Sequence, residues 1–404
     1  MNTKCGLIGK TLGHSYSKEL HEVFGAYEYE LYAVDERKAS DMIKSGEFAG
    51  LNVTIPYKQL AYSLCDVLSD DARAAGSVNA VVHRGGKVCG FNTDIFGFQY
   101  MLNRAGIDIC GKRVLILGSG GTSKTAQTVA ERLHANATVV SRTGDVNYEN
   151  VYDISDAEII INTTPVGMYP KNGVSPVELS RFPRCKGVAD VIYNPGKTAL
   201  LYEAEMQGIP NTNGLYMLAA QGKRAAEIFF DKELPASIIE KAVERLWQRY
   251  TNIVLIGMPG SGKSTVGKRV ADMLGRTFVD TDEIIAKCGK TPAEIICENG
   301  EDAFRAMESK TICELGKERG LVIATGGGAV EREENYLPLV QNGRIYLIER
   351  EISSLSRKGR PLSADVNALY KSRREKYERF ADVTVKNDAS PEDAAKKITE
   401  DFLG

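Results

Sequence analysis

Histidine is scarce in this chain of 404 residues, which holds only four, and its eight cysteines form no C-x-x-C pair. Both absences argue against a zinc site and a disulfide framework. No block of basic residues occurs and the net charge is −2, so nucleic acid is not an expected partner. No apolar run is long enough for a signal peptide or a membrane-spanning helix, so no membrane partner is expected. We expect a cytoplasmic protein with reduced thiols, and the composition leaves its oligomeric state open.

The length and composition instead indicate a globular protein with more than one domain. Hydrophobic residues make up 43% of the chain and charged residues 26%, and the length exceeds what one core usually organises. Short β-branched runs alternate with helical stretches, which is typical of parallel α/β folds. The first series of predicted strands comprises residues 5–9, 29–34, 51–56, a hairpin over 77–91 that turns at Gly85 and Gly86, 113–118, 137–142, 158–164 and 187–193.

A predicted helix near the middle of the chain closes this series. Its apolar residues fall on one helical face, and they are Ile238, Ile239, Ala242, Val243, Leu246 and Trp247. A second series follows without a Gly/Ser/Pro-rich linker. Its predicted strands are residues 253–257, 276–282, 322–328, 344–349 and 382–386. We predict one domain over residues 1–250 and a second over residues 251–404.

The second series opens with a complete phosphate-binding loop. The segment GMPGSGKS, residues 257–264, matches G-x-x-x-x-G-K-[ST] between an apolar strand and a predicted helix. In such a loop the backbone N–H groups cradle phosphate oxygens, Lys263 reaches the terminal phosphates and Ser264 ligates Mg²⁺. The second domain is therefore predicted to bind ATP or GTP. Its size of about 150 residues favours a small-metabolite kinase.

Charged residues after this loop could hold the acceptor of the phosphate. Asp280 and Asp282 end a predicted strand on the same side of it. One could support Mg²⁺ and the other could take the proton of an attacking hydroxyl, or the two could simply be an acidic strand end or a helix cap. Arg305 could clamp an anion, or it could form an exposed ion pair with Glu308 one helical turn away. The glycines at 326–328 would let a ligand touch the backbone.

In combination, these motifs resemble shikimate kinase over residues 251–404. They are the P-loop, D-x-D (280–282), F-R-x-x-E (304–308), G-G-G (326–328), R-P-L (360–362) and R-x-x-x-Y (373–377). The resemblance implies that Asp280 supports Mg²⁺ with Ser264, and that Asp282 acts as base or orienting group. The shikimate-binding residues that it implies are Asp282, Arg305, Gly327, Gly328 and Arg373. Those implied for ATP are Gly257, Gly260, Ser261, Gly262, Lys263, Ser264 and Thr265, with Arg357 and Arg360 from a lid that is shorter than usual in the family.

An earlier glycine loop, VLILGSGGTSKT at residues 114–125, misses two motifs by one residue each. Ser123 replaces the third glycine of G-x-G-x-x-G and the second glycine of a P-loop. The predicted strand that follows ends in Ser141-Arg142-Thr143, where an NAD site would carry an acidic residue for the ribose. A guanidinium there suits the 2′-phosphate of NADP. We predict an NADP-binding loop, with an ordinary glycine turn as the alternative, and we place Lys124 on the helix surface.

Polar residues upstream offer the chemistry that a ketone reduction needs. Such a reduction takes a hydride from a nicotinamide and a proton from a positioned acid. Lys58 and Asp94 could supply and orient that proton, or they could form a surface salt bridge. Ser15 and Ser17 could donate to a carboxylate, or they could cap a helix.

In their order along the chain, the motifs of residues 1–250 resemble shikimate dehydrogenase. They are S-x-S (15–17), N-V-T-I-P-x-K (52–58), G-x-V-N-A (76–80), N-T-D (92–94), G-S-G-G (118–121), N-T-T-P-V-G-M (162–168), D-V-I-Y-N-P (190–195) and G-L-Y-M-L-x-x-Q (214–221). The resemblance implies that Lys58 and Asp94 form the catalytic pair. The substrate-binding residues that it implies are Ser15, Ser17, Thr54, Lys58, Asn79, Asp94, Tyr193 and Gln221. Those implied for NADP are Gly118, Gly120, Gly121, Ser141, Arg142, Thr143, Gly214 and Met217.

Together the two resemblances imply a bifunctional enzyme of the shikimate pathway, which leads to chorismate and the aromatic amino acids. The first domain would reduce 3-dehydroshikimate with NADPH, and the second would phosphorylate shikimate with Mg-ATP. The first domain would have a substrate lobe (about 1–103 and 213–250) and an NADP lobe (about 104–212), with the site between them. Two alternatives are a shikimate-sensing protein that has lost its chemistry and a first site that acts on quinate. The sensor is disfavoured because the reactive groups are present.

Overall fold

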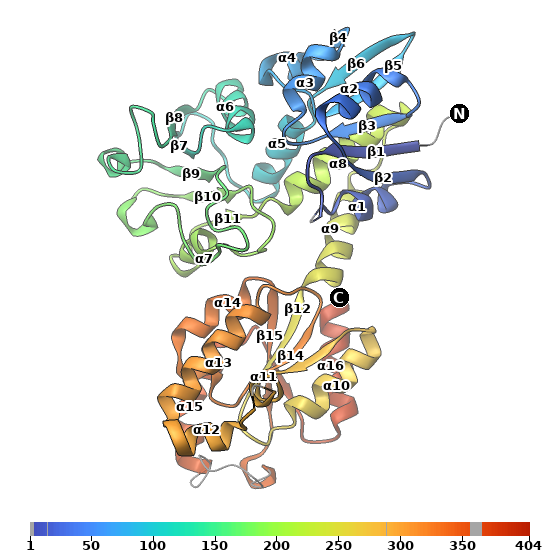
Figure 1. Cartoon of the computed structure of the whole chain (residues 1–404). Helices are drawn as coiled ribbons and strands as arrows, with labels where there is room; N and C mark the ends of the chain where they lie inside the picture. Colours follow the sequence, from blue (N-terminus) through green and yellow to red (C-terminus); the bar gives the residue numbers. More distant parts are fainter. Residues whose placement is uncertain (1–3, 14, 288, 356–365) are drawn as a thin grey trace. The chain divides into compact units, whose positions relative to one another are not determined.

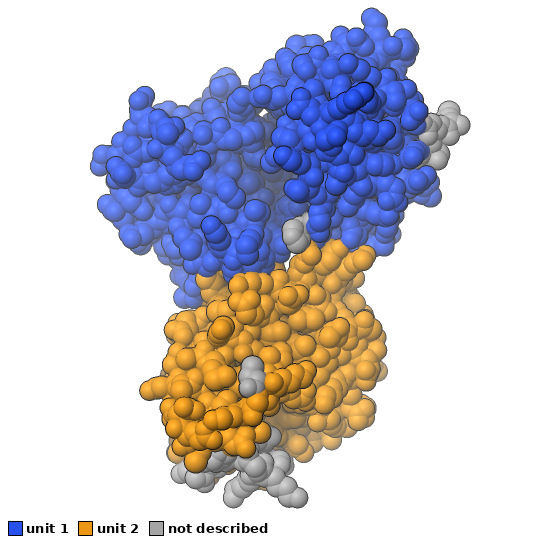
Figure 2. Space-filling view, in the orientation of Figure 1, with its two compact units in different colours: residues 1–246 blue, residues 247–404 orange. Residues whose placement is uncertain are grey.

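The computed structural model describes residues 4–13, 15–287, 289–355 and 366–404 (Figure 1). The chain divides into two compact units, Met1–Leu246 and Trp247–Gly404, which Figure 2 distinguishes by colour. The boundary falls within helix α9 (Ser237–Tyr250), whose buried residues Ile239, Ala242, Val243 and Leu246 follow the predicted helical face. Among the described helices, none combines the length and apolar character needed to cross a membrane.

The first sheet of unit 1 is mixed and has the strand order β2-β1-β3-β5-β6-β4. Strand β1 is parallel to β2 and β3, whereas β5 is antiparallel to β3 and β6. The strands are β1 (Lys4–Gly9), β2 (Glu28–Ala33), β3 (Gly50–Val53), β4 (Val67–Leu68), β5 (Ala80–Arg84) and β6 (Lys87–Phe91). The helices among them are α1 (Ser17–Phe24), α2 (Glu36–Ser45), α3 (Lys58–Leu64) and α4 (Asp70–Ala75). The predicted hairpin is confirmed, and Gly85 and Gly86 at its turn both have positive φ.

The second sheet of unit 1 is parallel throughout and has the order β11-β10-β9-β7-β8. Its strands are β7 (Arg113–Leu117), β8 (Asn136–Val140), β9 (Ile159–Asn162), β10 (Gly187–Asp190) and β11 (Asn211–Thr212), with helices α6 (Gly121–Arg132) and α7 (Ala199–Met206). Alternate residues of β7 belong to two hydrophobic clusters, so both faces of the sheet are buried. The strand order reverses between β7 and β9, which is where parallel α/β sheets usually bind ligands.

Helices α5 (Asp94–Arg104) and α8 (Leu215–Phe230) pack against each other. In the sequence, α5 connects the first sheet to the second, and α8 follows the last strand of the second sheet. Gly97 of α5 lies where they approach most closely, because a Cβ atom there would be 2.6 Å from the carbonyl oxygen of Met217. The same Cβ atom would be 2.9 Å from Cβ of Gln221. The close packing therefore positions α8, which carries two residues predicted to bind ligands.

Unit 2 contains a parallel sheet of order β13-β14-β12-β15-β16. Figure 1 shows α10 and α16 on one side of it and α13, α14 and α15 on the other. The strands are β12 (Asn252–Ile256), β13 (Phe278–Asp280), β14 (Val322–Ala324), β15 (Gly343–Glu349) and β16 (Val383–Lys386). The helices are α10 (Lys263–Leu274), α11 (Thr281–Ala286), α12 (Pro292–Asn299), α13 (Glu301–Leu315), α14 (Tyr336–Val340), α15 (Val366–Phe380) and α16 (Pro391–Leu403).

The predicted α/β class with parallel sheets is confirmed, and each predicted strand segment overlaps a strand of the structure. Strands β4 and β11 were not predicted. Each is only two residues long, and so short a segment shows no alternation of apolar and polar residues.

We expect Gly97→Ala to destabilise unit 1 by about 1–3 kcal/mol, because the added methyl group must push α5 away from α8. Urea unfolding followed by circular dichroism measures the change. Asn103→Ala, on the exposed side of the same helix, is the matched control. Equal stabilities of the two variants would show that the helices tolerate a wider separation.

Candidate active sites

A cavity of about 440 Å³ in unit 1 brings together residues of the first sheet with residues from loops and helices that follow strands of the second sheet. Every substrate-binding residue predicted for the dehydrogenase lines it, namely Ser15, Ser17, Thr54, Lys58, Asn79, Asp94, Tyr193 and Gln221. Gly121, Gly214 and Met217, predicted for NADP, line it too. Residues that are more than 200 positions apart in the sequence therefore share one cavity.

An ion pair between Lys58 and Asp94 lies in this cavity. Nζ of Lys58 is 2.5 Å from Oδ2 of Asp94, and the two side chains are 27% and 14% exposed. Lys58 is the first residue of α3 and Asp94 the first residue of α5, so two helix starts bring the pair together. The predicted alternative of an ordinary surface salt bridge does not fit a pair that is this shielded and lines a cavity.

A buried amide holds the carboxylate of this pair. Nδ2 of Asn79 donates to Oδ1 of Asp94 (2.9 Å) and to Oγ1 of Thr93 (3.0 Å), while the backbone N–H of Thr93 donates to Oδ1 of Asn79 (2.7 Å). The Thr93 hydroxyl also lies 3.3 Å from Oε1 of Gln221. Thr93 was not among the predicted site residues, although it is the middle residue of the N-T-D motif. It joins residues from three segments of the chain.

The two serines of the S-x-S motif also lie together. Oγ of Ser15 donates to Oγ of Ser17 (3.1 Å) and accepts from the backbone N–H of Ser17 (3.2 Å). Helix α1 begins at Ser17, yet its N-cap residue is Tyr16, which makes no side-chain capping bond. Ser15 thus satisfies the first backbone N–H of the helix, while both hydroxyls line the cavity, where they suit a carboxylate or hydroxyl of a ligand.

The first glycine loop connects β7 to α6 in the manner of a dinucleotide-binding turn. Gly118 has φ +106°, and a Cβ atom there would be 2.8 Å from Oγ1 of Thr163. By contrast, Cβ atoms at Gly120 and Gly121 would meet no atom within 4 Å. The backbone at the start of α6 is thus open for a phosphate to approach its N–H groups. Ser123 is fully buried and accepts from Gln127, and Lys124 is exposed, as predicted.

Ser141, Arg142 and Thr143 directly follow β8, the neighbour of β7. Arg142 and Thr143 are exposed and Ser141 is partly so. An exposed guanidinium at this edge, beside the open glycine loop, fits the 2′-phosphate of NADP. The charge and the space of this site therefore suit the predicted cofactor.

Asp190, in the D-V-I-Y-N-P motif, ends β10 and is fully buried. Its carboxylate accepts from the backbone N–H of Ile192 (3.0 Å), Nδ2 of Asn162 (3.1 Å) and Oγ1 of Thr198 (2.8 Å). Burial raises the pKa of Asp190 from 3.8 to about 6, although these hydrogen bonds lower it in part. The carboxyl group thus fixes both ends of residues 191–198, the segment that carries Tyr193.

This raised pKa predicts a pH-dependent loss of stability. Between pH 3.8 and about 6 the native state retains a proton that the unfolded state has lost, so unfolding becomes easier as the pH rises. Asp190→Asn removes this effect, and we expect its stability relative to the wild type to increase by about 2 kcal/mol between pH 4 and pH 6. Urea unfolding across this range measures the difference, with Asp145→Asn at an exposed position as control. A difference that is independent of pH would contradict the assignment.

In unit 2, the P-loop connects β12 to α10, as the motif predicts. Gly257, Gly260 and Gly262 all have positive φ. Lys263 is 8% exposed, and its Nζ donates to the carbonyl oxygens of Gly257 (2.8 Å) and Met258 (3.0 Å). The ammonium group therefore lies across the loop that would surround a phosphate. This position fits the binding of a nucleoside triphosphate.

Asn387 braces this loop and was not predicted from the sequence. It follows β16, is buried, and donates from Nδ2 to the carbonyl oxygen of Ser261 (2.7 Å). A Cβ atom at Gly262 would be 2.4 Å from this amide, so the close approach requires glycine. Of the other residues predicted for ATP, Ser261 is fully buried in the loop and Thr265 is exposed on α10.

Ser264 and Asp280 form the pair predicted to hold Mg²⁺. Oγ of Ser264 donates to Oδ2 of Asp280 (2.6 Å). A hydroxyl and a carboxylate side by side are oxygen ligands that Mg²⁺ accepts together with phosphate oxygens. The predicted placement of Asp282 on the same strand is wrong, because β13 ends at Asp280 and α11 begins at Thr281. Asp280 caps that helix by accepting from the backbone N–H of Asp282 (3.0 Å), so the local helix-capping interaction ends the strand.

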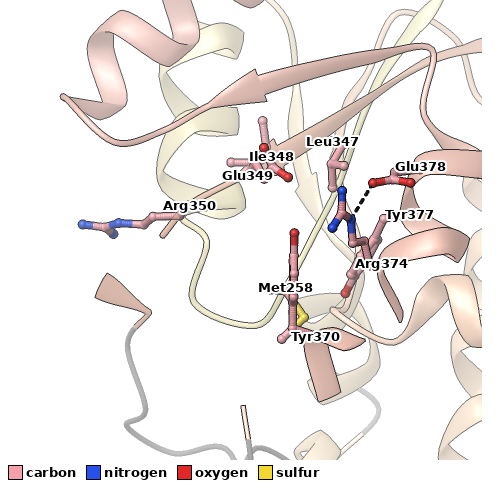
Figure 3. A pocket seen from close by; sticks show the side chains of 9 residues that line it. All are labelled: Met258, Leu347, Ile348, Glu349, Arg350, Tyr370, Arg374, Tyr377 and Glu378. Atoms are coloured by element: carbon pink, nitrogen blue, oxygen red, sulfur yellow. Dashed lines mark hydrogen bonds and ion pairs between the residues drawn. The ribbon is translucent and has the colours of Figure 1, made fainter. Parts of the chain in front are cut away.

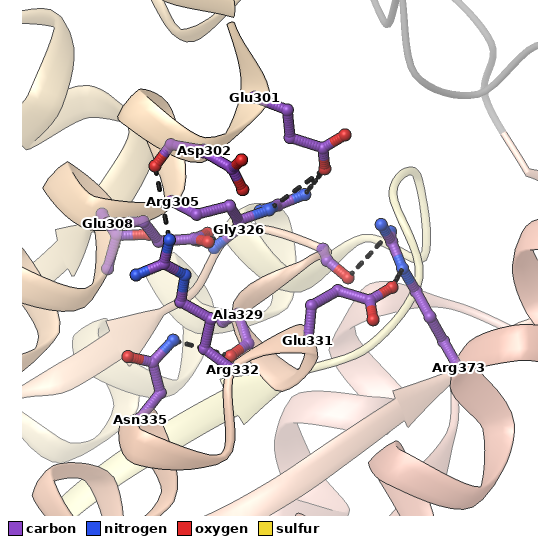
Figure 4. Close-up of polar contacts among 12 residues, drawn as sticks. Glu301, Asp302, Arg305, Glu308, Gly326, Ala329, Glu331, Arg332, Asn335 and Arg373 are labelled. Atoms are coloured by element: carbon purple, nitrogen blue, oxygen red, sulfur yellow. Dashed lines mark hydrogen bonds and ion pairs between the residues drawn. The ribbon is translucent and has the colours of Figure 1, made fainter.

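Arg305 and Glu308 form a buried ion pair, which corrects the alternative of an exposed one (Figure 4). Nη1 of Arg305 is 2.7 Å from Oε2 of Glu308, and the two side chains are 8% and 0% exposed. Burial raises the pKa of Glu308, against the lowering effect of Arg305. Cβ atoms at Gly326 and Gly328 would lie 2.3 Å from Oε1 of Glu308 and 2.1 Å from Nη2 of Arg305. These glycines therefore make room for the ion pair.

Arg373 of α15 reaches the same glycine segment. Its Nη1 donates to the carbonyl oxygen of Gly327 (3.2 Å), and its Nε donates to Oε1 of Glu331 (2.6 Å). Burial alone would disfavour the charge on Glu331, but Lys376 and Arg373 outweigh it and hold the pKa of Glu331 below its ordinary value. The structure thus brings Arg305, Arg373 and residues 326–328 together. The predicted lid residues Arg357 and Arg360 lie outside the described residues.

A separate cavity of about 20 Å³ lies beside the end of β15 (Figure 3). It is lined by Met258 of the P-loop and by Tyr370, Arg374 and Glu378 of α15, among others. This volume holds about one water molecule, so the cavity is too small for a nucleotide. Of the predicted site residues that the structure describes, none lines it.

These features define an α/β protein with a cavity for dinucleotide-dependent chemistry in one unit and a P-loop phosphotransfer site in the other. Residues 7–81 match the family model of the shikimate dehydrogenase substrate binding domain, and residues 259–402 match that of shikimate kinase. The shikimate dehydrogenase (NADP(+)) of Clostridium perfringens strain SM101 is 34% identical over 267 residues, which span 61% of this chain and 98% of that protein.

Two solved structures are similar to the same part of the chain. A chorismate mutase/shikimate 5-dehydrogenase fusion protein from Clostridium acetobutylicum has a TM-score of 0.58 and 33% identity, covering 61% of this chain and 97% of that one. Shikimate 5-dehydrogenase from Thermus thermophilus, in complex with NADP(H) and shikimate, has a TM-score of 0.55 and 27% identity, covering 60% and 98%. The chain belongs to the shikimate dehydrogenase family, and it carries a shikimate kinase domain after the dehydrogenase part.

Proposed function

We propose that the chain is a bifunctional enzyme that makes shikimate 3-phosphate in two steps. Residues 1–250 reduce 3-dehydroshikimate to shikimate with NADPH, and residues 251–404 transfer a phosphoryl group from Mg-ATP to shikimate. The observation that carries this proposal is the pairing of the two parts in one chain, since relatives of the first are named for shikimate and so is the family of the second. The product of the first reaction is thus the substrate of the second.

In the first reaction, NADPH supplies a hydride to the carbonyl carbon of the substrate. Lys58 would donate the proton that the carbonyl oxygen needs, and Asp94, at 2.5 Å from its Nζ, would orient the ammonium group. Asn79 fixes Asp94 in turn. The hydroxyls of Ser15, Ser17 and Thr54 would bind the polar groups of the substrate.

The cofactor would lie along the second sheet of unit 1. The open backbone at Gly120 and Gly121 would bind the pyrophosphate, and Arg142 would bind the 2′-phosphate of NADP. Gly214 and Met217 line the same cavity as Lys58, and they would bind the end of the cofactor that meets the substrate.

In the second reaction, ATP supplies the phosphoryl group with Mg²⁺ as its counter-ion. Lys263 and the P-loop backbone would hold the phosphates, while Ser264 and Asp280 would ligate the metal. Asp282 would orient the attacking hydroxyl and accept its proton. Arg305, Arg373 and the backbone at 327–328 would bind the carboxylate side of shikimate.

The expected partners are small molecules only, and a cytoplasmic location fits the supply of NADPH and ATP. The cytoplasmic location stays a prediction.

We expect Lys58→Ala to lower the rate of 3-dehydroshikimate reduction by about 10²–10⁴-fold, because the proton donor is lost, and to leave phosphorylation of added shikimate unchanged. Lys263→Ala should instead lower the rate of phosphorylation of added shikimate and leave the reduction of 3-dehydroshikimate unchanged. NADPH absorbance follows the first reaction, and mass spectrometry of shikimate 3-phosphate follows the second. Lys124→Ala, an exposed lysine, is the control for a lost charge. Retained activity in both lysine variants, or no product from the wild type, would refute the proposal.

A further inference from the structure

The guanidinium group of Arg305 already has two carboxylate partners within α13 (Figure 4). Glu308 is the inner one, at 2.7 Å from Nη1 with a side chain that is 0% exposed. Glu301 is the outer one, with a side chain that is 47% exposed. Two negative charges therefore surround one positive charge at the position where the proposed function requires an anion to bind.

Glu301 occupies the edge of the guanidinium that is suited to a ligand. Its Oε1 accepts from both Nε (3.2 Å) and Nη2 (3.0 Å) of Arg305. These two N–H groups form the parallel fork that binds both oxygens of a carboxylate. Glu301 uses only one oxygen for both bonds, so this contact is weaker than a true two-oxygen pair.

The other sides of the guanidinium are closed. Glu308 takes Nη1, and a Cβ atom at Gly328 would lie within 2.3 Å of Nη1, Nη2 and Cζ, so the backbone there packs against the group. The Nε–Nη2 edge under Glu301 is therefore the open approach. Because nearly half of the Glu301 side chain is in water, this carboxylate can turn into solvent and regain its full hydration, whereas the Glu308 side chain has no exposed surface through which to leave.

We propose that Glu301 is an internal competitor which occupies the fork of Arg305 in the absence of substrate and exchanges with the carboxylate of the acceptor. Glu308 remains as the permanent counter-ion. In the free enzyme Glu301 accepts hydrogen bonds from Nε and Nη2 of the buried Arg305. Without an acceptor, these N–H groups would be left unpaired at a cost in free energy. The apparent affinity for the acceptor equals the intrinsic affinity multiplied by the fraction of molecules in which the fork is free. This inference rests on the proposed phosphorylation of shikimate.

The test is the kinase reaction of the full chain with Glu301→Gln and Glu301→Ala. Removing the competing charge should lower the KM for shikimate by about 5- to 10-fold, with kcat and the KM for Mg-ATP changed less than about twofold. Asp302→Asn removes the same charge from the next residue of the same helix turn, and no ion pair of Asp302 with Arg305 is present among the described residues. It should leave the KM for shikimate within about twofold of the wild type.

The opposite outcomes are informative. A rise in KM in both variants would mean that Glu301 holds Arg305 in place for the substrate, and an unchanged KM would mean that it does not compete; either result overturns the inference. An equal fall in Asp302→Asn would assign the effect to the net charge of the helix start and would also overturn it. Absence of kinase activity in the wild type would instead refute the proposed function. Thermal unfolding of each variant checks that the unit is folded.

Discussion

The groups proposed to act in catalysis share one structural constraint, which is that each lies at or near the first residue of a helix. Lys58 begins α3, Asp94 begins α5 and Lys263 begins α10, while Asp282 is the second residue of α11. Helix starts have backbone N–H groups that no residue of the helix accepts, together with the positive end of the helix dipole. They favour carboxylates and phosphates and disfavour lysine. Each lysine there therefore needs acceptors close by, which Asp94 provides for Lys58 and the P-loop carbonyls for Lys263.

Burial of charge distinguishes the two sites. In the dehydrogenase cavity the ion pair of Lys58 and Asp94 remains partly exposed, so a ligand in the cavity can reach the lysine. In the kinase unit the whole residues Arg305 and Arg373, backbone included, are only 6% and 4% exposed. Removing charges from water is costly unless each one is paired, and Glu308 and Glu331 provide that pairing. The proposed site for an anionic acceptor is thus built largely from arginines that already have carboxylate partners.

Much of the fold and of both sites could be predicted from the sequence, because motifs with fixed spacing constrain the backbone. The P-loop defined a strand, a turn and a helix start, and the alternating runs defined the strands. The residues that reasoning from the sequence missed act across long separations. Thr93 bridges Asn79 and Gln221, and Asn387 braces a loop more than 120 residues earlier. Asn387 belongs to no predicted motif, and nothing within the N-T-D motif marks Thr93 as a bridge to Asn79 and Gln221, so only the tertiary structure reveals these contacts.

The wrong prediction that Asp282 lies on a strand has a different cause. The segment F-V-D-T-D reads as a continuous strand by alternation, but Asp280 accepts a hydrogen bond from the backbone N–H of Asp282 and starts a helix instead. Side-chain capping by aspartate competes with strand extension over such short segments. The sequence also could not show that the ion pair of Arg305 and Glu308 is buried, because an i,i+3 ion pair has the same spacing on a buried face of a helix as on an exposed one.

The most direct test of the bifunctional account follows two labels into one molecule. The purified wild-type chain would be incubated with 3-dehydroshikimate, Mg-ATP and NADPH that carries deuterium at both C4 positions, and the products would be identified by mass spectrometry. The account predicts shikimate 3-phosphate that contains one deuterium atom, since the hydride and the phosphoryl group are added by the same preparation. Deuterated shikimate without phosphate, or no deuterated product at all, would contradict it.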